Sequence, residues 1–179
     1  PTPEMKQAIF DAELGDDVYG EDPTVNELER LSAEIFGKED AVLVSTGTMG
    51  NLVSILSHCQ RGEQIIIGDK CHIYRAEAGG IASLGGIVPR ILKNDDDGTM
   101  DLNEIESNIE PKDVHRAPTK VVALENTANV VGGKIDDDQT AMEALNEAFK
   151  SKSYVYLTLG FFVCGWHIAL VATHIPVYI

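Results

Sequence analysis

The chain has 179 residues, 44 % of them hydrophobic, which is enough for one domain with a buried core. It carries 14 basic and 29 acidic residues, and this net charge of −15, without a basic stripe, argues against a nucleic-acid or anionic-membrane surface. Its three cysteines show no metal-ligand spacing and its first residues no signal peptide, so we expect a reduced, cytoplasmic protein without a bound metal. Because the sequence begins at Pro1 without an initiator methionine, we also expect residues before it.

The first predicted elements are two helices joined by an acidic loop. Apolar residues recur at helical spacing in the first helix, and glycine, proline and carboxylates dominate the loop. For the second helix, Thr24 is the expected N-cap, Glu27 completes a capping box, and Gly37 ends the helix. The helices are expected at Pro3–Ala12 and Thr24–Phe36, the loop at Gly15–Pro23, and the buried stripe of the second helix at Val25, Leu28, Leu31 and Ile35.

A third segment runs from strand character into a glycine- and hydroxyl-rich turn and then into a helix. Three apolar residues, Val42–Val44, precede the turn, and the helix extends to His58. The start of a helix offers unpaired N–H groups and a partial positive charge, so it attracts anions. Gly47 and Gly50 permit close approach of a phosphate, and Ser45, Thr46 and Thr48 can donate from their hydroxyls. The turn lacks a P-loop lysine and the glycine spacing of a dinucleotide fingerprint, so the interpretations are a phosphate cradle or an ordinary strand–helix connection.

The rest of the chain alternates strands with helices, which indicates an α/β fold with a largely parallel sheet. Ligands of such sheets bind beyond the carboxyl ends of the strands. Three polar segments fall at such ends: Ser45–Asn51, Asp69–His72 and Glu125–Asn129. The later strands are expected at Gln64–Ile67, Ile87–Leu92 and Lys120–Leu124, and the later helices at Ala76–Leu84, Asp101–Ile109 and Gln139–Phe149.

Four ordered motifs carry a family resemblance. They are Gly15–Thr24, Ser45–Asn51, His72–Gly80 and Leu124–Thr127. Together they resemble the low-specificity L-threonine aldolases, which are pyridoxal-phosphate (PLP) enzymes of the aspartate-aminotransferase fold type I. The resemblance spans residues 1–150 and implies the N-terminal part of that family's large domain, with a mostly parallel sheet and flanking helices.

The resemblance implies roles for several positions. Ser45, Gly47 and Thr48 match the family's phosphate-binding turn. His72 matches the histidine that stacks on the cofactor ring near the substrate hydroxyl, and Glu77 matches an acidic residue close to the chemistry, so these two are the expected catalytic residues. The alternatives are a structural core histidine at His72 and a helix-capping or solvated carboxylate at Glu77.

The acidic loop carries the expected subunit contact. Asp16 and Tyr19 resemble residues that reach the active site of a neighbouring subunit in a tetramer; alternatively they order a surface loop. The implied activity is PLP-dependent retro-aldol cleavage of L-threonine or L-allo-threonine to glycine and acetaldehyde. The resemblance thus implies a small amino-acid substrate, a homo-oligomer and a place in threonine breakdown and glycine formation, with no nucleic-acid partner.

Two departures set the chain apart from the family pattern. Ala128 stands where the family commonly has histidine or glutamine, so its side chain cannot move a proton. After Lys152 there is no aspartate, arginine or lysine, so the family's ring-nitrogen aspartate and Schiff-base lysine have no counterpart among these residues. We therefore expect this chain to be inactive, or nearly so, by itself.

The last residues form an uncharged apolar run. Ser153–Ile179 is long and apolar enough for a membrane span, but two histidines, two glycines and Pro176 interrupt it. We expect residues 151–179 to be a divergent tail, from splicing or gene-model read-through, in preference to a membrane anchor. Three other interpretations stay open: a non-catalytic subunit that joins a full-length aldolase, a membrane-tethered binding module, and a lyase of the same fold type acting on another amino acid, such as a β-eliminating lyase.

Overall fold

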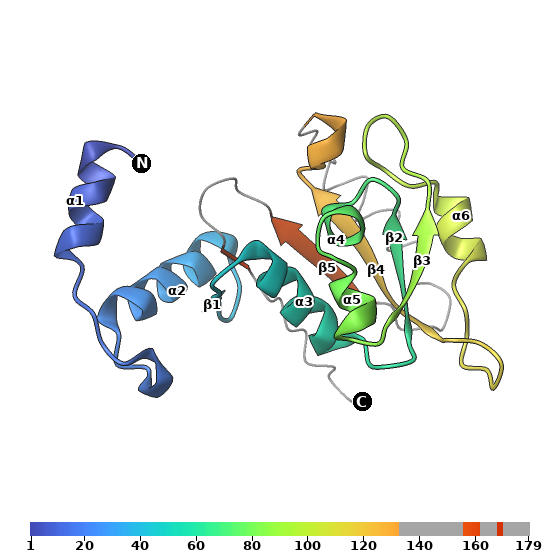
Figure 1. Ribbon diagram of the computed structural model, residues 1–179, viewed down its shortest axis with the longest axis horizontal. Helices are drawn as coiled ribbons and strands as arrows, with labels where there is room; N and C mark the ends of the chain where they lie inside the picture. Colours follow the sequence, from blue (N-terminus) through green and yellow to red (C-terminus); the bar gives the residue numbers. More distant parts are fainter. Residues whose placement is uncertain (133–155, 162–167, 170–179) are drawn as a thin grey trace. The chain divides into compact units, whose positions relative to one another are not determined.

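The computed structural model describes residues 1–132, 156–161 and 168–169 (Figure 1). These residues divide into two compact units, one within residues 1–43 and the other within residues 44–170. The expected helix Gln139–Phe149 and most of the tail Ser153–Ile179 lie outside the described residues. In the described part of the chain, no helix is both long and apolar enough to cross a membrane.

The first unit is helical, and its main helix begins one residue earlier than predicted. Thr24 is not the N-cap: the cap is Asp22, whose carboxylate accepts from the backbone N–H groups of Thr24 and Val25 at 3.0 and 2.9 Å. Pro23 occupies the first helical position, which a proline fills without losing an intrahelical hydrogen bond. The elements of this unit are α1 (Pro3–Asp11), η1 (Asp17–Tyr19), α2 (Pro23–Phe36) and the short strand β1 (Val42–Leu43).

The prediction that Leu31 and Ile35 belong to a buried stripe of α2 is wrong. Leu31 is 40 % exposed and Ile35 is 76 % exposed, whereas the buried residues of the helix are Ser32 and Ala33. Among the described residues of its unit, α1 buries none of its side chains and so provides no packed surface for α2. The predicted helix end is confirmed, because Gly37 closes α2 with φ 61° in the left-handed region.

Glu27 does not complete a capping box either. Its carboxylate pairs with Arg30, one turn further along α2, at 2.8 Å. The hydroxyl of Thr24, free of any capping role, donates to the carbonyl of Glu13 at 2.7 Å. The end of the acidic loop is therefore tied to the segment that precedes it.

The second unit is built on a four-stranded sheet in the order β3-β2-β4-β5, in which every neighbouring pair is parallel (Figure 1). This confirms the predicted α/β fold with a parallel sheet. The described part of the tail contributes the edge strand β5, which runs beside β4. The strands of this unit are β2 (Gln64–Gly68), β3 (Val88–Leu92), β4 (Thr119–Asn126), β5 (Tyr156–Phe161) and the separate short strand β6 (Ile168–Ala169).

Helices cover both faces of the sheet, with α3 (Gly47–His58) and α5 (Gly80–Ser83) on one face and α6 (Leu102–Ser107) on the other (Figure 1). The sheet has a hydrophobic core on each face, and alternate residues of β2 pack into the two cores. Ile65 and Ile67 pack with α3 and α5, and Ile66 packs with α6. All three isoleucines are fully buried. Such a continuous apolar run is what a parallel strand covered on both faces requires.

The single helix expected at Ala76–Leu84 is wrong. It is replaced by two short helices, α4 (His72–Arg75) and α5, with a break between them. Ala78 has φ 52° and Gly79 has φ 67°, and a right-handed helix cannot continue through such residues. The break leaves Glu77 between the helices, with its side chain buried.

Candidate active site

His72 opens α4, just beyond the carboxyl end of β2, and a buried carboxylate holds its ring. The ring Nδ1 lies 2.9 Å from Oε1 of Glu77. The Glu77 side chain is 4 % exposed and that of His72 is 25 % exposed, so the carboxylate is enclosed while the ring keeps access to solvent. An ionised carboxylate can only accept, so this contact places the proton of a neutral ring on Nδ1 and its lone pair on Nε2.

Asn51 connects this pair to α3. It lies in the second turn of the helix and donates from Nδ2 to the same Glu77 oxygen at 2.6 Å. Residues four apart share a helix face, so Asn51 lies below Gly47 on α3. The start of α3 and the ring of His72 are therefore linked through one carboxylate.

Glu125 brings in the third polar segment. One of its carboxylate oxygens accepts from the backbone N–H of His72, and the other accepts from the backbone N–H of Asn129 at 2.8 Å. Glu125 lies near the end of β4, and His72 follows the neighbouring strand β2. The segment Asp69–His72 thus contacts Glu125–Asn129 directly, and Glu77 links it to Ser45–Asn51.

In the described part of the chain, the first two N–H groups of α3 donate to no acceptor. Thr46 caps the helix, because its hydroxyl and its carbonyl accept from the N–H groups three and four residues further on, each at 3.0 Å. The helix start therefore offers the N–H groups of Gly47 and Thr48 to a ligand. Ser45 and Thr48 are exposed, and Gly47 is half-buried. These features fit a bound phosphate.

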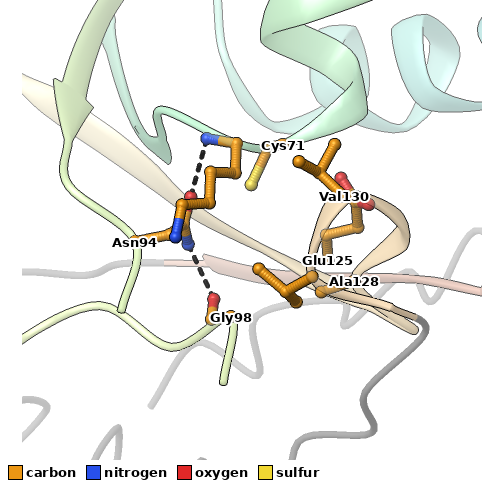
Figure 2. Close-up of a pocket in the computed structure, with 8 residues that line it drawn as sticks. Cys71, Asn94, Gly98, Glu125, Ala128 and Val130 are labelled. Carbon is orange, nitrogen blue, oxygen red and sulfur yellow. Dashed lines mark hydrogen bonds between the residues drawn. The ribbon is translucent and has the colours of Figure 1, made fainter. Parts of the chain in front are cut away.

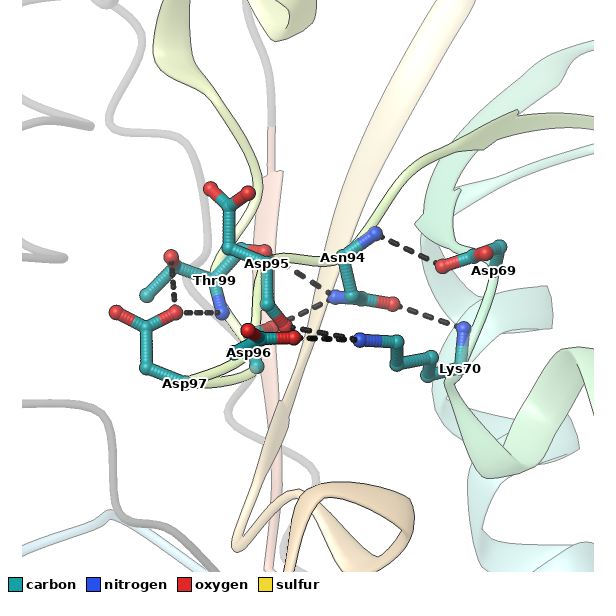
Figure 3. A network of polar contacts seen from close by, with 8 residues as sticks. Asp69, Lys70, Asn94, Asp95, Asp96, Asp97 and Thr99 are labelled. Carbon is teal, nitrogen blue, oxygen red and sulfur yellow. Dashed lines mark hydrogen bonds and ion pairs between the residues drawn. The ribbon is translucent and has the colours of Figure 1, made fainter.

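A second polar network centres on Asn94, which follows β3 (Figure 3). Its backbone N–H donates to Asp69 at 2.8 Å, its Oδ1 accepts from the backbone N–H of Lys70 at 2.9 Å, and its Nδ2 donates to the carbonyl of Gly98 at 2.6 Å. Asn94 is 3 % exposed, so these bonds lie in the interior. They fix the loop that leads from β2 to His72.

A cavity of about 10 Å³ lies between this network and Glu125 (Figure 2). That is room for roughly one water molecule and too little for a cofactor. Its wall includes Cys71 and Ala128, and Ala128 is 7 % exposed. The position at which the chain departs from the aldolase pattern is therefore close to the site and carries no group that can exchange a proton.

The two remaining predicted residues lie in the first unit. Asp16 caps η1, and its Oδ1 accepts from the backbone N–H of Val18 at 3.1 Å. Tyr19 is 77 % exposed. Within this chain Asp16 orders its own loop, as the alternative interpretation of that residue expects.

The sequence places Asn51 and Glu125 in polar segments but does not indicate their contacts, and Asn94 lies in none of these segments. A signal for Asn94 was available, because it follows β3 as Asp69 follows β2. No comparable signal points from Asn51 to Glu77, which lie 26 residues apart.

The parallel sheet and the polar residues at its carboxyl edge agree with the family comparison. The profile of the beta-eliminating lyase family matches residues 1–154, and the chain belongs to that family. The low specificity L-threonine aldolase of Escherichia coli is 50 % identical over 129 residues, which cover 72 % of this chain and 39 % of that protein. The predicted resemblance to threonine aldolases is confirmed.

Solved structures show the same fold. The threonine aldolase of Leishmania major superposes with a TM-score of 0.67 at 26 % identity, over 88 % of this chain and 44 % of that one. A structure from Campylobacter jejuni that carries N′-pyridoxyl-lysine-5′-monophosphate superposes with a TM-score of 0.60 at 17 % identity, over 90 % of this chain and 36 % of that one. The chain spans between 32 % and 39 % of the length of the first curated relatives that it matches.

Proposed function

We propose that this chain forms the phosphate- and ring-binding part of a PLP-dependent L-threonine aldolase. The N–H groups of Gly47 and Thr48 hold the cofactor phosphate, and His72 stacks on the cofactor ring. The observation that carries the proposal is the contact from Asn51 through Glu77 to His72, which joins these two features in one polar network. The aldolases among the relatives and the pyridoxyl-lysine in a structural neighbour support the choice of cofactor.

The proposed reaction is retro-aldol cleavage of L-threonine or L-allo-threonine to glycine and acetaldehyde. When bound, PLP supplies an electron sink that allows the Cα–Cβ bond to break. His72, with its Nδ1 proton directed to Glu77, accepts the proton of the substrate hydroxyl at Nε2. Ala128 cannot share this proton transfer, so His72 is the base that we propose among the residues the structure describes.

The rest of the machinery is proposed to lie outside these residues. No lysine, aspartate or arginine follows Lys152, and we propose that the chain does not turn over substrate by itself. The whole protein is proposed to be a cytoplasmic homo-oligomer that breaks down threonine and forms glycine. Asp16 and Tyr19 then serve the site of a neighbouring subunit.

A second candidate is a non-catalytic subunit that joins a full-length aldolase. Its support is the pattern of exposed apolar side chains in the first unit, where Phe10 is 84 % exposed, Leu14 is 80 % exposed and Val18 is 86 % exposed. Large apolar side chains gathered in one short region are a common feature of protein interfaces.

Acetaldehyde release tests the proposed reaction. The purified chain is mixed with PLP and either L-threonine or L-allo-threonine, beside a PLP-only control and the variant His72→Phe. We expect no release above the control from the chain alone. Release that His72→Phe abolishes would contradict the proposed inactivity, although it would support the role of His72.

Size-exclusion chromatography with the full-length E. coli aldolase tests the second candidate. Co-elution of the two chains would favour a subunit role, and separate elution would count against it. The variant Phe10→Ser serves as the matched control, because it removes an exposed apolar side chain of the first unit and should abolish a genuine association.

A further inference from the structure

Asn51 has no role in the phosphate turn or in stacking, yet it donates to an enclosed charge. Its Nδ2 lies 2.6 Å from Oε1 of Glu77, and the ring Nδ1 of His72 lies 2.9 Å from that same oxygen. The Glu77 side chain is 4 % exposed, and Asn51 is half-buried. One buried carboxylate oxygen therefore receives two side-chain donors, of which only the histidine can change its charge.

A buried carboxylate needs donors to compensate for the water it has lost. If the imidazole were the only side-chain donor, Glu77 would favour the imidazolium, which is the stronger hydrogen-bond partner of an anion. A neutral amide satisfies the carboxylate without bringing a charge. By donating to Glu77, Asn51 thus reduces the extent to which this carboxylate stabilises the imidazolium form of His72.

Two other charged residues of the described part of the chain, Glu125 and Arg75, do not replace this function. Glu125 contacts the backbone N–H of His72 and accepts there, so it does not donate to Glu77. Arg75 lies three residues further along α4 and is exposed. The ring Nδ1 of His72 contacts the carboxylate of Glu77, and the amide of Asn51 contacts the same carboxylate oxygen.

We propose that Asn51 is a positioning residue whose amide lets Glu77 hold His72 as a neutral ring with its proton on Nδ1. It acts through Glu77 and needs no contact with substrate or cofactor. This inference rests on the proposed function only for the role of the His72 ring as the base that accepts the proton of the substrate hydroxyl. The protonation state and tautomer of the His72 ring depend on residues of this chain, so they can be measured without PLP.

Nitrogen-15 NMR of the histidine rings in the full chain provides the test. At about pH 8, where an ordinary imidazole is neutral, we expect His72 to show two well-separated ring nitrogen signals with the proton on Nδ1. The variant Asn51→Asp replaces the donor by a second carboxylate. We expect the ratio of imidazolium to neutral ring to rise at least about tenfold, the factor that one hydrogen bond to a charged group supplies, and the two signals to converge.

Three further variants make the result specific. The double variant Asn51→Asp with Glu77→Gln restores one carboxylate and one amide, so the ring should return to the neutral form. Asn103→Asp adds the same charge at an exposed position of α6 and should leave His72 unchanged. Asn51→Ala removes the donor without adding a charge and should shift the ratio in the same direction as Asn51→Asp, which keeps the test open if the aspartate variant fails to fold.

A neutral His72 ring in both Asn51→Asp and Asn51→Ala, with backbone amide spectra like those of the wild type, would overturn the proposal. An unrestored ring in the double variant would overturn it as well, because the effect would then not pass through Glu77. Failure of the proposed function would appear separately, as the absence of phosphate-cofactor binding by the wild-type chain.

Discussion

At the residue scale, Gly68 shows how closely the loop before His72 is packed. A Cβ atom at this position would lie 2.0 Å from Oδ1 and 2.4 Å from Nδ2 of Asn94. Asn94 is buried and cannot move without breaking its bonds to Lys70 and Gly98. We expect Gly68→Ala to lower the free energy of unfolding by about 2 kcal/mol, measured by urea denaturation, since overpacking and lost hydrogen bonds act together.

Gly80→Ala is the matched control for this prediction. Gly80 is the first residue of α5, and a Cβ there would meet no atom within 4 Å. We expect a change below about 1 kcal/mol, because alanine is the better helix former. Equal losses in the two variants would contradict the packing argument.

Cys59 is a second residue whose surroundings determine its chemistry. It is 1 % exposed, and burial, with a smaller contribution from Glu63, raises the pKa of its thiol from 9.0 to about 12. Above about pH 9 the unfolded chain loses this proton while the folded chain retains it, so the stability that the thiol contributes falls as pH rises toward 12.

The pH dependence of unfolding measures this effect. Between about pH 8 and 10 we expect the free energy of unfolding of the wild type to fall by roughly 1 kcal/mol more than that of Cys59→Ala. Parallel curves for the two proteins would show that the thiol titrates alike in the folded and unfolded chain.

At the scale of the element, α2 depends on Asp22. Its carboxylate accepts from the backbone N–H groups of Gly15, Thr24 and Val25 at 2.9 to 3.0 Å. These bonds, that from Gly15 first, hold the pKa of Asp22 below its ordinary value. The stability that the carboxylate contributes is therefore present above the ordinary aspartate pKa of about 4, and it is lost as pH falls through the lower, folded value.

We expect Asp22→Asn to lower the thermal unfolding midpoint, followed by circular dichroism, at neutral pH. The difference from the wild type should shrink on acidification below about pH 4, where the wild-type carboxylate is also neutralised. Asp17→Asn, an exposed change in the same loop, should show no such pH-dependent difference. A difference from the wild type that is constant with pH would contradict the assigned role of Asp22.

The elements that sequence predicted well are those decided by local chemistry. Gly37 ends α2 because a left-handed residue is needed there, and the run of isoleucines in β2 can only suit a strand covered on both faces. The errors arose where two local signals competed. Asp22 and Thr24 are both good N-caps, and Pro23 between them decided the outcome.

At the scale of the whole molecule, sequence predicted that three polar segments fall at the carboxyl ends of strands, and the parallel pairing of β2 with β4 brings two of these ends to one edge of the sheet. The contacts inside the site could not be predicted. Glu77 reaches Asn51 and His72 because the chain breaks at Ala78, whose φ of 52° no sequence pattern indicates. The site therefore depends on one unfavourable backbone conformation that the surrounding structure enforces.

Binding of a phosphate at the start of α3 is the part of the proposed function on which the rest depends. It is tested most directly by titrating the chain with pyridoxine 5′-phosphate, which keeps the ring and phosphate of the cofactor but cannot react with lysines. Gly47→Pro removes one N–H donor, and the change suits the backbone, because Gly47 is the first helical residue and Thr46 before it is extended at φ −149° and ψ 155°. Leu102→Pro makes the same change at the start of α6.

We predict saturable binding by the wild type and by Leu102→Pro, and binding at least about tenfold weaker by Gly47→Pro, the loss expected for one hydrogen bond to an anion. Equal affinity of Gly47→Pro and the wild type, or no saturable binding by folded wild-type chain, would contradict the assignment of the phosphate site.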